Sequence, residues 1–462
     1  MSKKIGGVVA LAAMCALSLF LVNCGSSSSR PSGLLYVLTQ GSNGTGNAVS
    51  SFAIDLNSGN LSLINSNAST CATAGTCGLP LDIVLDPKGA AAFVLNQGIP
   101  CVQGGNCVSP CGPSLAPCGS IPPTIYPYKV NSDGSLSAPG TPTVLSRPSS
   151  ASDTQDDADL ALAMVRDATG QFLFVINKGT NPPPASCLND PLPTSNFDAC
   201  PSISVFTISG TSLTLVGGSA LHPGNPLHLN RIPNALSAVT VSSPSEELLF
   251  VTSNKDLSNN HNDNTLSVYG VGSDGTLTEK IGSPYATPTI NPSSVFAVNT
   301  NVAPQNNNGG VFAYVGAAGN ASGALDAFEV CTVVGAVCNQ ADLDNATLLP
   351  VGTSPTSTGQ NPVGIVVDPT NNFLYVVCEG SSQVFGYRIF STTGVLTAQN
   401  PASLQTGSQP VALAIHSSGE FLYTSNSGSS NVSAFTLSTT SGSMNSLSTV
   451  TSPPGPSGMA AR

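Results

Sequence analysis

Short runs of alternating hydrophobic and polar residues recur along most of the chain, and the runs form a repeat. One recurring run is almost continuously apolar, as in Phe373-Leu374-Tyr375-Val376-Val377, and copies begin near residues 34, 92, 172, 248, 311, 373 and 421. A second run follows it and alternates residue by residue, as in Val432-Ser433-Ala434-Phe435-Thr436-Leu437. Runs of both kinds are typical of β-strands when glycine, proline and asparagine bound them.

Two further elements complete each repeat. A glycine turn and a short edge strand follow the alternating run, as in Thr393-Gly394-Val395-Leu396, because glycine supplies the positive φ of the turn. A strand of small and β-branched residues, such as Val363 to Val367, precedes the apolar run and suits a crowded axis. Seven units of four antiparallel strands, without a convincing helix, predict an all-β fold, a seven-bladed β-propeller.

The chain ends indicate how the ring closes. The first repeat starts at its second strand, Leu34 onward, and the sequence finishes with an orphan inner strand around Met459. We therefore expect the propeller to occupy residues 34–462 and the N- and C-terminal strands to pair. A propeller needs no partner to bury its core, so we expect a monomer.

The repeat resembles the lactonase-type seven-bladed propellers, the superfamily of the 6-phosphogluconolactonase-like and YVTN-repeat proteins. The resemblance covers about Leu34 to Arg462 and rests on the Asp-Pro-x-x-x-Phe-Leu-Tyr-Val core, Asp368 to Val376, and on the Gly-x-Leu turn. Both motifs build blades, so they specify the fold and not the chemistry. Enzymes of this kind would be expected to place His, Arg or Glu where the inner strands begin, and this chain mostly does not.

The N-terminus predicts an exported lipoprotein. Lys3 and Lys4 precede an apolar run, Val8 to Val22, which has the layout of an export signal and is too short to span a bilayer comfortably. The stretch Leu21-Val22-Asn23-Cys24 resembles a bacterial lipobox, which implies cleavage after residue 23 and acylation of Cys24. Residues 1–23 would be a signal peptide and 24–33 a flexible tether. Gly25 after the cysteine implies the outer membrane, on its periplasmic or surface face.

Charge narrows the choice of partners. The chain has 13 basic against 24 acidic residues, a formal net charge of −11. Binding of nucleic acid is not expected, because neutralising phosphates takes clustered Lys and Arg. The amide- and hydroxyl-rich loops suit an envelope protein or a carbohydrate instead.

Cysteine usage supports an oxidising compartment. The sequence has 13 cysteines, and ten fall into four local groups between strand-like runs: Cys71 and Cys77; Cys101, Cys107, Cys111 and Cys118; Cys187 and Cys200; Cys331 and Cys338. Local disulfides that brace long loops are the favoured interpretation, and the group of four allows three pairings. Metal binding is disfavoured because no Cys-x-x-Cys gap or neighbouring His occurs. Cys378, inside an apolar strand, is expected to be a buried inert thiol.

Candidate functional residues lie in long loops on one face of the predicted propeller. A catalytic hypothesis uses Arg231 to hold a substrate carboxylate, and His228 or Asp157 to activate water at a lactone carbonyl. The alternative is that these are ordinary solvated loop residues. His261 lies in another loop of the same face and is a candidate ligand contact.

Amides where the inner strands begin are further candidate ligand contacts, namely Asn291, Asn361 and Gln409, each followed by proline. No cofactor is expected. Calcium is conceivable at the acidic group between Asp153 and Asp159 or at Asn260 to Asn264, but neither matches the pattern of a calcium loop. The leading hypothesis is an envelope-anchored binding or assembly module, and the alternative is a hydrolase of an envelope sugar lactone.

Overall fold

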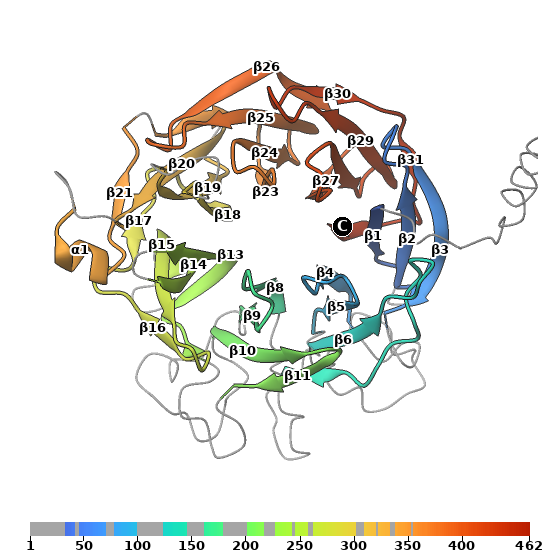
Figure 1. Ribbon diagram of the computed structural model, residues 1–462, viewed down its shortest axis with the longest axis horizontal. Coiled ribbons are helices and arrows are strands. Elements are labelled where there is room, and N and C mark those ends of the chain that lie inside the picture. Colours follow the sequence, from blue (N-terminus) through green and yellow to red (C-terminus); the bar gives the residue numbers. More distant parts are fainter. Residues whose placement is uncertain are drawn as a thin grey trace, which may run out of the picture.

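The computed structural model shows seven antiparallel sheets arranged around a central axis (Figure 1). It describes residues 33–41, 46–70, 78–98, 123–145, 161–178, 201–216, 227–242, 245–256, 262–301, 309–319, 322–332, 338–352 and 354–462. Each sheet is a blade of four strands, and four blades carry one extra short strand. The four strands follow sequence order from the axis outward in six blades, whereas in the first blade the last strand of the chain is innermost. The predicted seven-bladed β-propeller is confirmed.

The four positions in each blade are filled in the same way around the ring. The inner strands, from the first blade to the seventh, are β32 (Pro456–Ala461), β4 (Pro80–Leu85), β8 (Ala161–Arg166), β13 (Arg231–Ser242), β18 (Pro292–Asn299), β23 (Pro362–Val367) and β27 (Pro410–Ile415). The second strands are β1 (Gly33–Thr39), β5 (Ala91–Asn96), β9 (Phe172–Asn177), β14 (Ser245–Asp256), β19 (Val311–Ala317), β24 (Phe373–Cys378) and β28 (Phe421–Asn426).

The outer half of each blade is less regular. The third strands are β2 (Ala48–Ile54), β6 (Thr124–Lys129), β10 (Ser202–Ser209), β15 (Asn262–Val271), β20 (Gly323–Val330), β25 (Gln383–Ile389) and β29 (Asn431–Leu437). The fourth are β3 (Leu61–Ser69), β7 (Thr143–Val144), β11 (Ser212–Leu215), β16 (Leu277–Glu279), β21 (Leu348–Pro350), β26 (Leu396–Gln405) and β30 (Met444–Ser446). The extra strands are β12 (Leu227–His228), β17 (Tyr285–Ala286), β22 (Thr356–Thr358) and β31 (Val450–Thr451).

The ring closes between the two ends of the described chain. Strand β1 pairs with β32, with Tyr36 opposite Ala460 and Val37 opposite Met459. The backbone amides of Leu34 and Arg462 each donate to the carbonyl of the other residue, at 3.1 and 2.9 Å. The predicted closure by the terminal strands is therefore confirmed. Within the described residues the one helix is α1 (Gln340–Asp344), and none is long and apolar enough to cross a membrane.

The repeated Asp-Pro motif builds the turn between the inner and second strands. The Asp368 carboxylate accepts hydrogen bonds from the backbone amides of Phe373 and Asn372, at 2.7 and 2.9 Å. Asp86 accepts in the same way from the amide of Ala91, at 2.6 Å. His416 occupies this position in the seventh blade, and its Nδ1 accepts from the Ser418 amide at 3.1 Å. These side chains therefore shape turns.

The second strands form the buried layer of each blade, and a central aromatic residue in each reaches toward the following blade. In four blades this residue is tyrosine, whose hydroxyl donates to the carbonyl of a turn glycine in the next blade, as Tyr36 to Gly134, Tyr314 to Gly394, Tyr375 to Gly442 and Tyr423 to Gly59 at 2.8–2.9 Å. Phe93, Phe174 and Phe250 take the position in the second, third and fourth blades and have no hydroxyl. The hydrogen bond therefore joins only part of the ring.

Candidate functional site

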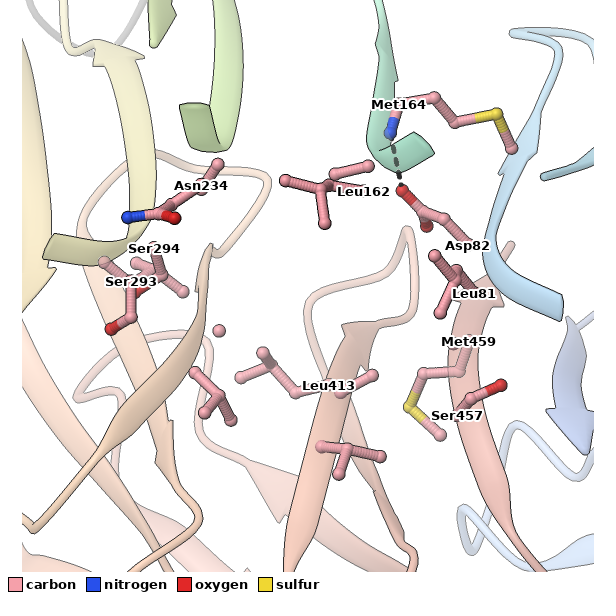
Figure 2. Close-up of a pocket in the computed structure, with 18 of the residues that line it drawn as sticks. Leu81, Asp82, Leu162, Met164, Asn234, Ser293, Ser294, Leu413, Ser457 and Met459 are labelled. Carbon is pink, nitrogen blue, oxygen red and sulfur yellow. Dashed lines mark hydrogen bonds between the residues drawn. The ribbon is translucent and has the colours of Figure 1, made fainter. Parts of the chain in front are cut away.

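A cavity of about 620 Å³ lies on the axis of the propeller. Its wall comes from the first half of all seven inner strands, together with Gln40 after β1 and Ser427 after β28 (Figure 2). The inner strands begin on the face that also carries the connections between second and third strands, so the cavity lies toward that face. Its size is typical of small-molecule sites.

One position repeats around the wall and differs in a single blade. The pairing of each inner strand with the second strand shifts register near its start. The position considered is two residues after Pro80 in the second blade, and two residues after the equivalent of Pro80 in the other blades, which is Pro233 in β13 and the first residue of the strand elsewhere. The seven residues at this position, from the second blade to the first, are Asp82, Ala163, Ala235, Ser294, Gly364, Ala412 and Gly458. Six are small, as expected for a crowded axis, and the second blade places a carboxylate there.

Most other polar side chains of the wall connect neighbouring blades. The Asn234 amide donates to the carbonyl of Pro292 at 2.8 Å, and the Ser293 hydroxyl donates to the carbonyl of Pro362. Ser457 and Gln40 donate to the carbonyl of Pro80, at 2.8 and 3.0 Å. These donors therefore bind the first residue of the inner strand in the next blade.

Asp82 is the one ionisable side chain in the described wall of the cavity. Its Oδ1 accepts from the amide of Ile83 at 2.8 Å, and its Oδ2 accepts from the amide of Met164 in the next blade at 2.9 Å. Figure 2 shows it beside Leu162 and Leu81. Burial raises the pKa of the Asp82 carboxyl, and the two amide donors oppose this only in part.

The predicted catalytic residues are not gathered on this wall. Arg231 begins β13 and forms an ion pair with Asp263, Nε to Oδ2 at 3.1 Å, and it does not line the cavity. His228 lies in β12, which pairs with β10, so β9 and β10 separate its backbone from the inner strand β8, about 14 Å across three strand spacings. Asp157 lies outside the described residues. The catalytic role of the three residues stays a prediction.

The predicted amide contacts stand at turns that enter the inner strands. Asn291, Asn361 and Gln409 have positive φ angles of 58°, 51° and 51°. Their carbonyls accept hydrogen bonds from the amides that follow the second strands, at 3.0, 2.9 and 2.9 Å. Asparagine tolerates this backbone region better than most residues, which explains two of the three. Ligand binding by them and by His261, which lies outside the described residues, stays a prediction.

The cysteine predictions are confirmed where the structure describes them. Cys331 and Cys338 form a disulfide that brackets residues 332–337. Cys378 is a buried free thiol, and burial raises its pKa to about 11, so it stays protonated at neutral pH.

The other predicted disulfides fall on segments that the structure does not describe. Eight of the ten cysteines lie outside the described residues, so their pairing stays a prediction: Cys71, Cys77, Cys101, Cys107, Cys111, Cys118, Cys187 and Cys200. The acidic group from Asp153 to Asp159, the first candidate for calcium, lies outside them too. Within the described part of the chain, no cluster of His, Cys, Asp and Glu could hold a metal ion.

Sequence reasoning missed Asp82, although a signal for it exists. Aligning the inner strands by their opening proline sets Pro80-Leu81-Asp82 beside Pro362-Val363-Gly364, and the acidic residue then differs from its six equivalents. The loops drew attention instead, because they hold most of the chain's histidines.

Comparison with known proteins agrees with this architecture. Residues 323–461 match the model of the family described as lactonase, seven-bladed beta-propeller. This segment runs from β20 to the closing strand β32, so it includes the Asp-Pro-x-x-x-Phe-Leu-Tyr-Val core and excludes Asp82. No curated protein matches the chain.

Solved structures resemble the whole propeller at low sequence identity. A 6-phosphogluconolactonase-like protein of Bacteroides fragilis is 12% identical with a TM-score of 0.57, and the match covers 94% of this chain and 99% of that one. A periplasmic gluconolactonase of Pseudomonas aeruginosa is 16% identical with a TM-score of 0.57, over 93% of this chain and 99% of the other. The resemblance to lactonase-type propellers is thus confirmed for the fold.

Proposed function

We propose that the chain is a lipid-anchored propeller of the cell envelope that binds a small molecule in its central cavity. The composition of the cavity wall carries this proposal. Most of its amide and hydroxyl donors hold neighbouring blades together, and within the described wall there is no Lys, Arg or His. A phosphorylated lactone would need cationic partners for its phosphate. A cavity whose wall is more apolar than polar suits a ligand with an apolar body.

Capture of a ligand from the envelope tests the binding role. We expect at least one small molecule to copurify with the full-length protein in neutral detergent, and to fall roughly tenfold or more in Leu162→Trp, because the larger side chain would fill the cavity. Leu63→Trp is the matched control, since Leu63 is 57% exposed on β3. Mass spectrometry of extracted small molecules gives the comparison, and identical profiles for wild type and Leu162→Trp would count against a site in the cavity.

Lipid anchoring is tested separately. Because Cys24 is the proposed acylation site, full-length Cys24→Ala is expected to lose incorporation of a labelled fatty acid and to leave the membrane fraction. Cys15→Ala, which changes a cysteine within the proposed signal, should keep both properties. Labelling of Cys24→Ala at the wild-type level would refute this part of the proposal.

Lactone hydrolysis is the second candidate, and Asp82 is the observation that favours it. A carboxylate whose pKa burial raises could act as a general base toward water in the cavity. The family match and the lactonases among proteins of similar fold support the same reaction class. The described wall offers no cationic side chain for the developing oxyanion, which is why binding is preferred.

A further inference from the structure

Asp82 is not required by the blade architecture. The equivalent position in the six other inner strands holds Gly, Ala or Ser, and those strands pair with their second strands in the same manner. The Asp82 carboxylate accepts a hydrogen bond from the backbone amide of Met164 in the next blade. A small residue in place of Asp82 would leave that amide facing the cavity. Asp82 therefore gives the wall an ionisable group that the equivalent positions of the other six blades lack.

The carboxylate also has unused acceptor capacity. An ionised carboxylate offers about four lone-pair positions, and two are used by the amides of Ile83 and Met164. The described ion pairs of the chain, Arg231 with Asp263 and Lys280 with Glu246, do not involve it. None of the described Lys and Arg side chains lines the cavity. The remaining positions can accept from a ligand.

The surroundings of Asp82 are apolar and restrict which ligand fits. Leu81, Leu162, Leu413 and Met459 contribute aliphatic or thioether surface to the same wall. Four of the wall's amide and hydroxyl donors, on Gln40, Asn234, Ser293 and Ser457, are committed to proline carbonyls, so the wall has few free donors for the many hydroxyls of a sugar. An organic ammonium ion concentrates its hydrogen-bond donors on one charged nitrogen, which the free lone-pair positions of the Asp82 carboxylate can accept from, and its apolar body suits the rest of the wall.

We infer that the cavity takes a small organic ammonium ion, with its charged nitrogen donating to Asp82 and its apolar body against the aliphatic wall. This rests on the proposed binding function and names its ligand class. Burial raises the pKa of the Asp82 carboxyl because it removes the water that would stabilise the negative charge. A bound ammonium ion would stabilise that charge in place of the water. The chain's net charge of −11 would favour approach of a cation over that of an anion.

Three probes of similar shape test the inference. Binding of phenethylammonium, 2-phenylethanol and 3-phenylpropanoate to the full-length protein in neutral detergent is measured by isothermal titration calorimetry. We expect the ammonium to bind at least about tenfold more tightly than the alcohol, because a hydrogen bond to a charged group is the stronger one. The carboxylate should bind most weakly. Equal affinity of ammonium and alcohol would overturn the inference and leave a neutral-ligand cavity standing.

Two substitutions at Asp82 locate the effect. Asp82→Asn and Asp82→Ala should each abolish the preference for ammonium over alcohol. Alanine is the natural residue at the equivalent position of three other blades, Ala163, Ala235 and Ala412. Asp274→Asn removes one negative charge from an exposed turn and should keep the preference. A preference that survives both Asp82 variants, in protein that melts at the wild-type temperature, would overturn the assignment. Copurification of a small molecule with the wild type and with Leu162→Trp tests the binding function itself. A failure of that function would therefore be distinguished from a failure of the ammonium assignment.

Discussion

Gly442→Ala is expected to destabilise the protein by about 3–5 kcal/mol, whereas Gly210→Ala should cost only about 1–2 kcal/mol. Both glycines have positive φ angles, 74° and 60°, so alanine bears a similar backbone penalty at each. A Cβ on Gly442 would lie 2.3 Å from Cδ1 of Phe373 in the preceding blade, while a Cβ on Gly210 meets nothing within 4 Å. The difference isolates packing between blades.

Urea titration of the full-length variants measures this difference. If both substitutions cost the same free energy of unfolding, the contact between Phe373 and the Gly442 turn does not hold the sixth and seventh blades together. The account of the inter-blade contacts would then be wrong.

Tyr375→Phe should cost about 1–3 kcal/mol, because it leaves the buried carbonyl of Gly442 without its donor. Burial raises the pKa of Tyr375, so its hydroxyl stays protonated and able to donate. Tyr285→Phe is the matched control, since the Tyr285 hydroxyl is buried and has no hydrogen-bond partner within the described residues. That variant should change stability by no more than about 0.5 kcal/mol in the unfavourable direction. A loss in Tyr285→Phe as large as in Tyr375→Phe would contradict the role given to the hydrogen bond.

These contacts explain how the sequence specifies the fold so clearly. The core of each second strand, such as Leu374-Tyr375-Val376 in the sixth blade, is buried on both faces, so its apolar run is visible without knowledge of the structure. The turn glycine and the Asp-Pro turn are fixed by backbone geometry and recur in the same order along the chain. Local rules therefore coincide with the fold, and repetition makes them detectable.

The residues of the candidate site are harder to predict from the sequence, because their positions depend on side-chain direction and on neighbouring segments. Whether Arg231 faces the axis depends on the side of β13 to which it points and on the neighbouring Asp263, and neither follows from its position in the sequence. His228 looked like a loop residue near the axis but lies in a short outer strand of the third blade. Asp82 becomes visible only when the seven inner strands are aligned with one another, in sequence or in structure.

The ring is also uneven in a way that concerns the site. In the second, third and fourth blades phenylalanine takes the place of the tyrosine, so the hydrogen bond to a turn glycine is missing there. Asp82 joins the second blade to the third by accepting a hydrogen bond from the Met164 amide. The carboxylate thus lies at a blade boundary that lacks the tyrosine hydrogen bond.

The central claim is that the cavity binds its ligand and does not hydrolyse it. The most direct measurement is the hydrolysis of phosphorylated and unphosphorylated sugar lactones by the purified full-length protein, with Asp82→Asn and Arg231→Ala assayed in parallel. We predict no turnover above the uncatalysed rate for any of the three proteins. Turnover by the wild type that disappears in Asp82→Asn, with the fold intact, would contradict the claim and identify the protein as a lactonase.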